Sequence, residues 1–208
     1  MASPEKISIT LKSLANRRIG TVALLGFASG LPLALTGGTL QAWMAVEGVD
    51  LKTIGLFSLV GLPYALKFFW APLLDRFTLP FLGRRRGWIL VTQFALMGLI
   101  FLLSLTSPQN TPWLVALLAL LLTFTSATQD IVIDAYRTDV LREKERGLGA
   151  AVSVTGYRIA MLTSGALALI LADPLGWRLT YMLMAALMLI GAVATFFGPE
   201  PERACHPP

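Results

Sequence analysis

The sequence predicts an all-α polytopic membrane protein with six transmembrane helices. Of its 208 residues, 55% are hydrophobic and only 14% are charged, and the mean hydropathy is +0.69. A soluble domain of this length cannot bury so much apolar surface, whereas a lipid bilayer can accept it. In addition, apolar runs long enough to cross the roughly 30 Å hydrocarbon core recur along the whole chain.

Each predicted helix contains about 20 or more mostly apolar residues, which is the length that a membrane span requires. The predicted helices cover residues 19–45, 51–74, 88–107, 112–136, 147–172 and 177–198. Residues 1–18 form a polar, basic N-terminal segment, and 199–208 resemble a tail or the start of a linker. The first apolar run is too long for a signal peptide and has no clear small-residue cleavage site, so we expect it to remain as a helix.

Lysine and arginine lie mainly on one side of the predicted membrane. The basic residues of that side are Lys6, Lys12, Arg17, Arg18, Arg76, Arg84, Arg85, Arg86, Arg137, Arg142, Lys144, Arg146 and Arg203. The opposite side has only Lys52 and Arg178. This bias predicts that both termini are cytoplasmic. The net charge of +5 then reflects membrane topology, and nucleic acid is not an expected partner.

The tryptophans also follow the predicted membrane boundaries. Trp43, Trp113 and Trp177 fall near the outer ends of helices, and Trp70 and Trp88 fall near the inner ends. Amphipathic indole rings prefer the headgroup level. The sequence therefore predicts two aromatic belts.

Four ionisable residues fall inside predicted helices: Lys67, Asp130, Asp134 and Arg158. A charge in hydrocarbon is costly unless it is paired, hydrated or turned to the bundle interior, so these residues mark a candidate proton or substrate path. The helix rise places Lys67, Asp130 and Arg158 at overlapping depths in the cytoplasmic half of the bilayer. Because a short loop joins the fourth and fifth helices, we expect an Asp130–Arg158 pair, with Lys67 as the next candidate partner of Asp130.

Gln129 and Tyr157, which neighbour Asp130 and Arg158, can add hydrogen bonds to this path. A simpler interpretation applies to Lys67 and Asp134, because both are near enough to the interface to reach headgroups or loop arginines. Asp134 can also hold the following loop through Arg137.

Small residues in two helices predict close helix packing. Gly26 and Gly30 make a G-x-x-x-G step in the first helix, and Gly156 begins a small-residue stripe in the fifth. Pro32 removes one backbone hydrogen bond and frees the carbonyl of Ala28. The first helix is therefore either a bent helix that lines a cavity or an ordinary packing seam.

The connection between the second and third helices combines a carboxylate with several arginines. Such groups can form a charge-assisted clasp that acts as a cytoplasmic gate, or the arginines can simply fix membrane topology. The residues of this motif are Asp75, Arg76, Gly83, Arg84, Arg85 and Arg86.

This connection resembles the G-x-x-x-D-R-x-G-R-R/K signature of the major facilitator superfamily. Ala71 stands in place of the leading glycine, and additional residues separate Phe77 from Gly83. More specifically, the chain looks like the AmpG-type muropeptide permeases. The segments that carry this resemblance are 26–33, 50–57, 66–76, 83–88 and 127–139, the last of which reads Ala-Thr-Gln-Asp-Ile-Val-Ile-Asp-Ala-Tyr-Arg-Thr-Asp.

The resemblance implies one six-helix half of a major-facilitator fold in the bacterial inner membrane. It implies proton-coupled import of N-acetylglucosamine–anhydro-N-acetylmuramic acid peptides for cell-wall recycling, a flux that governs β-lactamase induction in many bacteria. Acetyl-CoA carriers of the same superfamily look similar in the Gly-Arg-Arg and Thr-Gln-Asp segments, so such a carrier is the alternative.

Members of this superfamily have two six-helix halves with the transport site between them. We therefore expect the chain to be a truncated permease, a subunit of a split transporter, or a half that pairs with a second copy. A membrane protein that does not transport is the remaining alternative. We expect no enzyme, because HExxH and GxSxG motifs are missing from the sequence. We expect no cofactor and no metal, because Cys205 and His206 stand alone.

Overall fold

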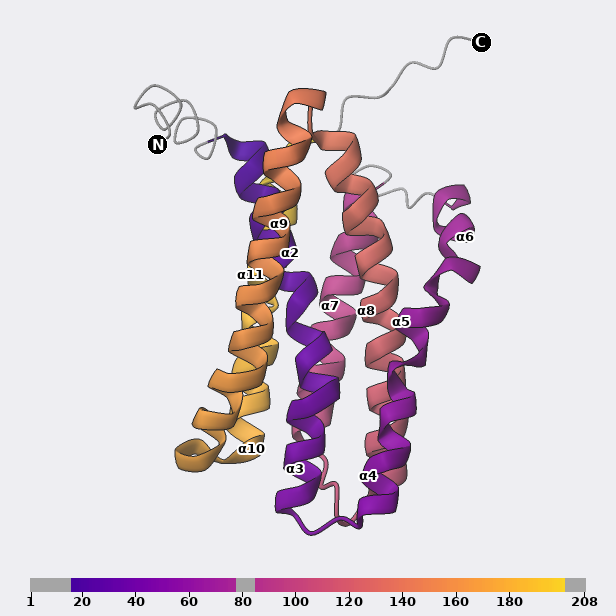
Figure 1. Cartoon of the computed structure of the whole chain (residues 1–208), viewed down its shortest axis with the longest axis vertical. Coiled ribbons are helices and arrows are strands. Elements are labelled where there is room, and N and C mark those ends of the chain that lie inside the picture. Colours follow the sequence, from indigo (N-terminus) through magenta and orange to yellow (C-terminus); the bar gives the residue numbers. More distant parts are fainter. Residues whose placement is uncertain (1–15, 78–84, 201–208) are drawn as a thin grey trace.

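The computed structural model of the chain describes residues 16–77 and 85–200, and in these ranges all regular structure is helical (Figure 1). Within the described residues, five helical segments are long and apolar enough to cross a membrane. They are Arg17–Val46, Leu51–Phe69, Arg86–Ser104, Pro112–Val140 and Glu143–Phe197. The prediction of an all-α polytopic membrane protein is confirmed.

The fifth segment accounts for two of the six predicted helices. It has 55 residues, or about 80 Å of straight helix, whereas the hydrocarbon core is only about 30 Å thick. The two ends of this segment nevertheless lie at the same end of the bundle, because both contact the start of the first helical segment. Asn16 Nδ2 donates to Glu145 Oε1 over 2.7 Å, and Arg17 Nε donates to the Phe197 carbonyl over 2.8 Å. The chain reverses at Gly176, where φ is +77° and ψ is 160°.

A glycine turn therefore replaces the loop that the sequence predicts between residues 172 and 177. The helices of this segment are α9 (Arg146–Leu162), α10 (Ala168–Leu187) and α11 (Leu189–Phe197). A 3₁₀ turn, Glu143–Glu145, precedes α9, and a π-helical turn, Thr163–Leu167, joins α9 to α10. The left-handed backbone of Gly176 suits glycine because no Cβ obstructs it.

The first segment is a bent helix built from α2 (Arg17–Ala34), the π turn η1 (Leu35–Thr39) and α3 (Leu40–Val46). Asn16 caps α2 by accepting the amide hydrogen of Arg18 over 3.2 Å. Pro32 lies inside α2, and the backbone leaves helical geometry shortly afterwards, at Gly37 (φ −90°, ψ −114°). A proline followed by a π turn is a common cause of a helix kink.

The second segment is not the continuous helix that residues 51–74 predict. It consists of α4 (Leu51–Phe57), η2 (Ser58–Gly61), α5 (Leu62–Leu66) and η3 (Lys67–Phe69), where η2 and η3 are 3₁₀ turns, and α6 (Ala71–Arg76) follows it. Pro63 and Pro72 lie in the first turns of α5 and α6. Proline cannot donate the backbone hydrogen bond that would continue the preceding helix, so each proline restarts it.

The remaining helices, α7 (Arg86–Ser104) and α8 (Pro112–Val140), are regular and pack against each other. The first segment is central, since α2 packs against α8, α9 and α11. Figure 1 shows α4 and α5 beside α8, with α6 directed away from the bundle. The second span thus sits at the edge of the molecule.

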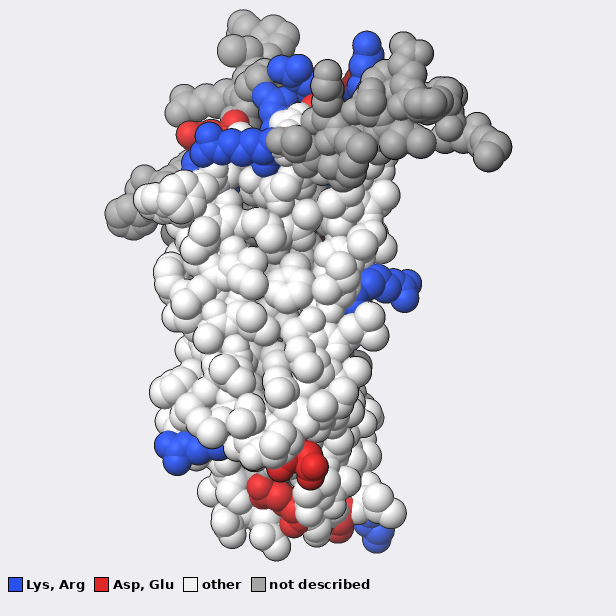
Figure 2. Space-filling model, turned by 90° about the vertical axis from the view of Figure 1, so that its left-hand side faces the viewer, with Lys and Arg blue, Asp and Glu red and all other residues white. Residues whose placement is uncertain are grey.

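Charge divides the molecule into three zones. Figure 2 shows a broad, mostly uncharged middle between two charged ends: mainly basic side chains where α2 begins and α11 ends, and an acidic cluster flanked by basic side chains at the opposite end. A basic side chain also projects from this middle zone. An apolar band between two charged ends is the surface expected of a membrane protein.

The tryptophan belts form only in part. Trp113 is 87% exposed, as a belt residue should be, whereas Trp43 is only 2% exposed. Trp43 stacks on Trp177 with ring centroids 5.9 Å apart and lies 5.0 Å from the ring of Tyr181. The prediction that Trp43 is a belt residue is wrong, because helix packing covers its ring.

Candidate functional site

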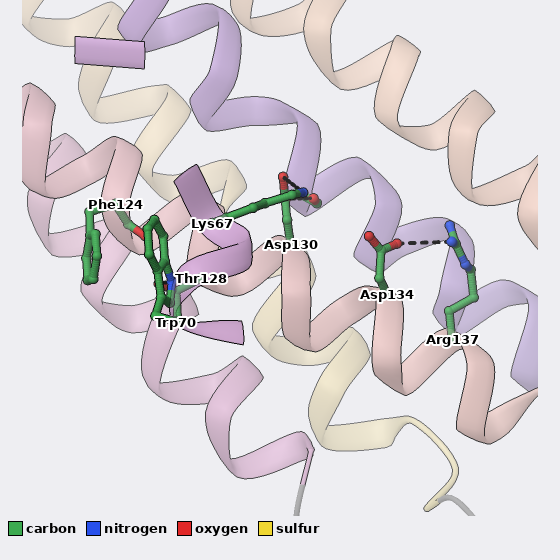
Figure 3. A network of polar contacts seen from close by, with 8 residues as sticks. Lys67, Trp70, Phe124, Thr128, Asp130, Asp134 and Arg137 are labelled. Carbon is green, nitrogen blue, oxygen red and sulfur yellow. Dashed lines mark hydrogen bonds and ion pairs between the residues drawn. The ribbon is translucent and has the colours of Figure 1, made fainter. Parts of the chain in front are cut away.

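The centre of the candidate site is Asp130 on α8. Its side chain is 12% exposed, and the residue pairs with groups from two other helical segments. The Ser29 hydroxyl on α2 donates to Asp130 Oδ1, and Lys67 Nζ lies 3.8 Å from Asp130 Oδ2 (Figure 3). A carboxylate at this depth thus has one cation and one hydroxyl donor, which lower the cost of its charge.

Lys67 reaches Asp130 because residues next to it dock on α8. Trp70 Nε1 donates to Thr128 Oγ1 over 3.1 Å, and the Trp70 and Phe124 rings lie 4.8 Å apart (Figure 3). The 3₁₀ turn η3 places Lys67 one turn before this contact. Tertiary contacts of the tryptophan therefore fix the position of the lysine.

Glycines on α2 and α9 allow the backbones of these two helices to come into contact. A Cβ on Gly26 or Gly156 would lie closer than 3.0 Å to the backbone carbonyl oxygen of Ser153 or Ala23, respectively. A Cβ on Gly30 would lie 2.5 Å from the carbonyl oxygen of Tyr157. Only glycine permits this approach of the two backbones. We call these contacts the α2–α9 seam.

The first helix shows both the packing seam and the bend, and its lining of a cavity stays a prediction. Its glycines form the seam with α9, and Pro32 precedes the departure from helical geometry at Gly37. Ser29 lies on the same helix and contacts the candidate site.

The expected Asp130–Arg158 pair does not form. Arg158 is exposed on α9, and among the described residues its side chain makes no ion pair. The reason is geometric: Gly156 faces α2 in the seam, and two residues further along a helix the side chain points to the opposite face. Lys67, the second candidate for Asp130, takes the place that sequence reasoning gave to Arg158.

The other predicted path residues divide between separate contacts. Asp134 Oδ1 lies 3.0 Å from Arg137 Nη2, and the Asp134 side chain is 56% exposed (Figure 3). The Gln129 amide donates to Gln93 Oε1 on α7, and Gln93 Nε2 donates to the Met188 carbonyl over 2.5 Å. Gln129 therefore faces away from Asp130. Tyr157 lies beside the seam, within electrostatic range of Asp130 and Asp134.

The arginines of the loop motif bind elements of this same helical unit. Arg85 Nε lies 3.2 Å from Asp139 Oδ2, at the end of α8. Arg86 donates to the carbonyl oxygens of Thr195 and Phe196, over 3.0 Å and 2.7 Å, at the end of α11. Arg76 is exposed at the end of α6. Gly83 and Arg84 lie outside the described residues, as does the side chain of Asp75, so a clasp through Asp75 stays a prediction.

Sequence reasoning missed two polar residues near the candidate site, Tyr64 and Ser126, and also Gln93 on α7, the partner of Gln129. Tyr64 precedes Lys67 by three positions and Ser126 precedes Asp130 by four, so helical periodicity places each beside a charged residue. That spacing was the available signal. In the described part of the chain, no group of three or more possible metal ligands occurs.

A multi-pass helical bundle with charged and amide side chains between its helices defines an integral membrane protein of the polytopic α-helical class. Residues 22–208 match the Major Facilitator Superfamily, and the chain belongs to this superfamily.

The sequence is also similar to named proteins of bacteria. It is 56% identical over 192 residues to the anhydromuropeptide permease of Escherichia coli K12, covering 92% of this chain and 39% of that protein. It is 45% identical over 187 residues to an uncharacterized protein of Haemophilus influenzae, covering 89% and 44%. It is 36% identical over 191 residues to the putative transporter AmpG 4 of Rickettsia felis, covering 89% and 45%. The chain thus spans less than half the length of these relatives.

Proposed function

We propose that the chain forms half of a proton-coupled importer of anhydromuropeptides, N-acetylglucosamine–anhydro-N-acetylmuramic acid peptides, in the bacterial inner membrane. In this proposal both termini are cytoplasmic, a second six-helix half completes the substrate path, and the imported sugar peptides enter cell-wall recycling. The 56% identity to the anhydromuropeptide permease of Escherichia coli supports the substrate class. The Asp130–Lys67 pair is the observation that supports proton coupling.

The proposed coupling uses the two states of the Asp130 carboxyl group. When ionised, the carboxylate holds Lys67 at 3.8 Å. Uptake of one proton removes this negative charge, and the Lys67 ammonium is then free to bind a carboxylate of the sugar peptide. Release of the proton on the other side restores the ion pair and expels the substrate carboxylate. The Lys67 side chain is 36% exposed, so a ligand can reach it.

Arg158 has a separate role in this proposal. It is a cation on the exposed face of α9 within an apolar span, and a lone charge facing lipid is costly. We infer that Arg158 faces the second half or the substrate, where a carboxylate offsets its charge.

The loop arginines and the charge distribution support the proposed orientation. Figure 2 shows basic side chains at the end of the bundle where α2 begins, and cytoplasmic ends of bacterial membrane proteins carry such an excess. A reporter protein that is active only in the cytoplasm should therefore give a signal when it is fused after residue 200.

Uptake of labelled anhydromuropeptide by cells that express the complete protein tests the function. Asp130→Asn should abolish accumulation driven by the proton gradient, while exchange of internal for external substrate without a gradient should persist. Asp134→Asn is the matched control, because Asp134 is a carboxylate one turn away that pairs with Arg137. It should retain at least half of the wild-type uptake.

Two outcomes would contradict the proposal. Gradient-driven accumulation by Asp130→Asn at the wild-type level would remove Asp130 from coupling. If the wild-type protein took up acetyl-CoA but not anhydromuropeptide, the proposed substrate class would be wrong and acetyl-CoA would take its place.

A further inference from the structure

Two buried hydroxyl groups near the candidate site have no hydrogen-bond partner among the described residues. They are Tyr64 Oη on α5 and Ser126 Oγ on α8. In the described ranges the only other buried side-chain nitrogen or oxygen atom without a hydrogen-bond partner is Gln129 Oε1, which belongs to the separate contact with Gln93. Buried hydroxyls are nearly always hydrogen-bonded, so this pair requires an explanation.

Ser126 differs from the other hydroxyl side chains of its own helix. Thr123, Thr125, Thr128 and Thr138 each donate to the carbonyl one turn earlier, over 3.1, 2.8, 2.8 and 3.0 Å. Such bonds within the helix are the ordinary solution for serine and threonine in membrane spans. The Ser126 hydroxyl makes no such bond and is therefore directed to another partner.

Tyr64 differs in the same way from two other buried tyrosines. Tyr136 Oη donates to the Pro199 carbonyl over 2.6 Å, and Tyr181 Oη donates to the Leu35 carbonyl over 3.0 Å. Buried tyrosine hydroxyls usually find such an acceptor. The Tyr64 and Ser126 hydroxyls lie within interaction range of each other but do not meet in hydrogen-bond geometry, so one small polar group that bonds to both would satisfy them.

The register of α5 and α8 places this pair beside the ion pair. Tyr64 lies three residues before Lys67 and Ser126 lies four before Asp130, so each hydroxyl is one helical turn from a charged group on the same face. Tyr64 also interacts electrostatically with Asp130. The stretch from α5 to η3 and the helix α8 thus present a neutral polar pair and a charged pair, one turn apart.

We propose that Tyr64 and Ser126 form a binding site for one hydroxyl group, supplied either by a water molecule or by a sugar hydroxyl of the carried substrate. The Tyr64 hydroxyl donates to the oxygen of this group, and the group donates to Ser126 Oγ. The sugar arm of this proposal rests on the proposed function, and the water arm does not. Bridging waters of this kind are common wherever two buried polar groups lack direct partners.

Thermal unfolding of the complete protein in detergent, without substrate, tests the water arm. Tyr64→Phe and Ser126→Ala should each lower the melting temperature by about 2–4 °C, and the double variant should fall no further than one single variant, because both remove the same bridge. In a dry site, removal of an unpaired hydroxyl leaves the melting temperature unchanged or raises it. Thr125→Ala and Tyr157→Phe are matched controls outside the proposed site.

The uptake assay tests the sugar arm. If a substrate hydroxyl binds here, both variants should raise KM for anhydromuropeptide about tenfold with kcat unchanged and with the melting temperature not lowered. Ser126→Thr retains a hydroxyl and should restore most of the affinity.

Lowered, non-additive melting temperatures support a bound water, and a raised KM supports a bound sugar. Unchanged KM together with unchanged or raised melting temperatures would overturn the site. If the wild-type protein takes up no anhydromuropeptide, the proposed function fails, and the melting temperatures alone then decide for or against the site.

Discussion

The α2–α9 seam and the segment from α4 to α6 lie in the same bundle but are held very differently. Within the most apolar stretch of each span, 67% of the residues are buried in Arg17–Val46, against 11% in Leu51–Phe69. The seam is fixed by contacts between backbones, whereas the second span is divided by two 3₁₀ turns and meets α8 through a few side chains.

We expect this difference to separate a scaffold from an element that is able to move. Close-packed backbones have one arrangement, whereas a helix held by an ion pair and an indole contact can exchange those partners at modest cost. The candidate site contains one group from each region, because Ser29 belongs to the scaffold and Lys67 to the loosely held span. A change of charge at Asp130 can therefore alter the position of one span without disturbing the other.

The strongest test of the scaffold is Gly156→Ala. The added Cβ would overlap the carbonyl oxygen of Ala23, a backbone atom that cannot move without shifting α2. Overpacking of this kind costs about 1–3 kcal/mol, and we expect the upper end of that range. Thermal unfolding in detergent measures the loss.

Gly98→Ala is the matched control for this substitution. A Cβ on Gly98, inside α7, meets nothing within 4 Å. Alanine should be neutral there or stabilise the helix by up to about 1 kcal/mol. Equal effects of Gly98→Ala and Gly156→Ala would show that the seam is not tightly packed.

A second test addresses the amide contacts among α7, α8 and the junction of α10 and α11. Gln93→Leu removes the acceptor of the Gln129 amide and leaves that buried donor without a partner. We expect a loss of about 2 kcal/mol in unfolding free energy, since an unpaired buried polar group costs about 1–3 kcal/mol. The double variant Gln93→Leu and Gln129→Leu should recover part of the lost unfolding free energy. Additive losses would show that the two amides do not depend on each other.

A smaller effect is expected from Lys67→Met in the loosely held span. The lysine is partly exposed and 3.8 Å from Asp130, so the loss of stability should be about 1 kcal/mol. Amide hydrogen exchange should increase in residues 62–76 and stay unchanged in α2 and α9. Faster exchange across the whole bundle would show that the two regions are not independent.

The smallest effect concerns the start of the same span. The Asp50 carboxylate accepts hydrogen bonds from the Thr53 hydroxyl and from the amides of Lys52 and Thr53, and these bonds lower the pKa of Asp50 below its usual 3.8. The cap therefore stabilises α4 above pH 3.8 and is lost as the pH falls through the lower pKa of the folded state.

Asp50→Ala should accordingly increase amide exchange in the first turn of α4 at neutral pH and leave the melting temperature nearly unchanged. Asp50→Asn should preserve most of the protection, because asparagine also caps helices. If the amides in the first turn of α4 exchanged as slowly in Asp50→Ala as in the wild-type protein, the Asp50 cap would not stabilise this helix.

Much of the fold could be predicted from the sequence, and the helix breaks show where prediction stopped. Hydropathy identifies the apolar runs because a bilayer selects them by length and composition. Pro63 and Pro72 were visible as helix breakers, but membrane helices often tolerate proline, so only tertiary contacts decide between a kink and a restart. The reversal at Gly176 likewise depends on which surfaces the two legs meet.

The candidate site was predictable in its residue types and only partly in its pairing. The sequence indicates that Asp130 needs a cation, and Lys67 and Arg158 lie at similar depths. Arg158 was preferred because its helix follows directly after that of Asp130. The seam glycines instead rotate Arg158 to the far face of α9, and the Trp70 contact brings Lys67 to Asp130.

The sequence by itself determined that the chain is a helical membrane protein with charges buried in its spans, because composition alone decides which segments partition into lipid. The tertiary structure decided which charges meet, which hydroxyls stay without a partner and which span is loosely held. Those outcomes depend on the rotation of each helix about its axis, and that rotation is set by contacts between residues far apart in the chain.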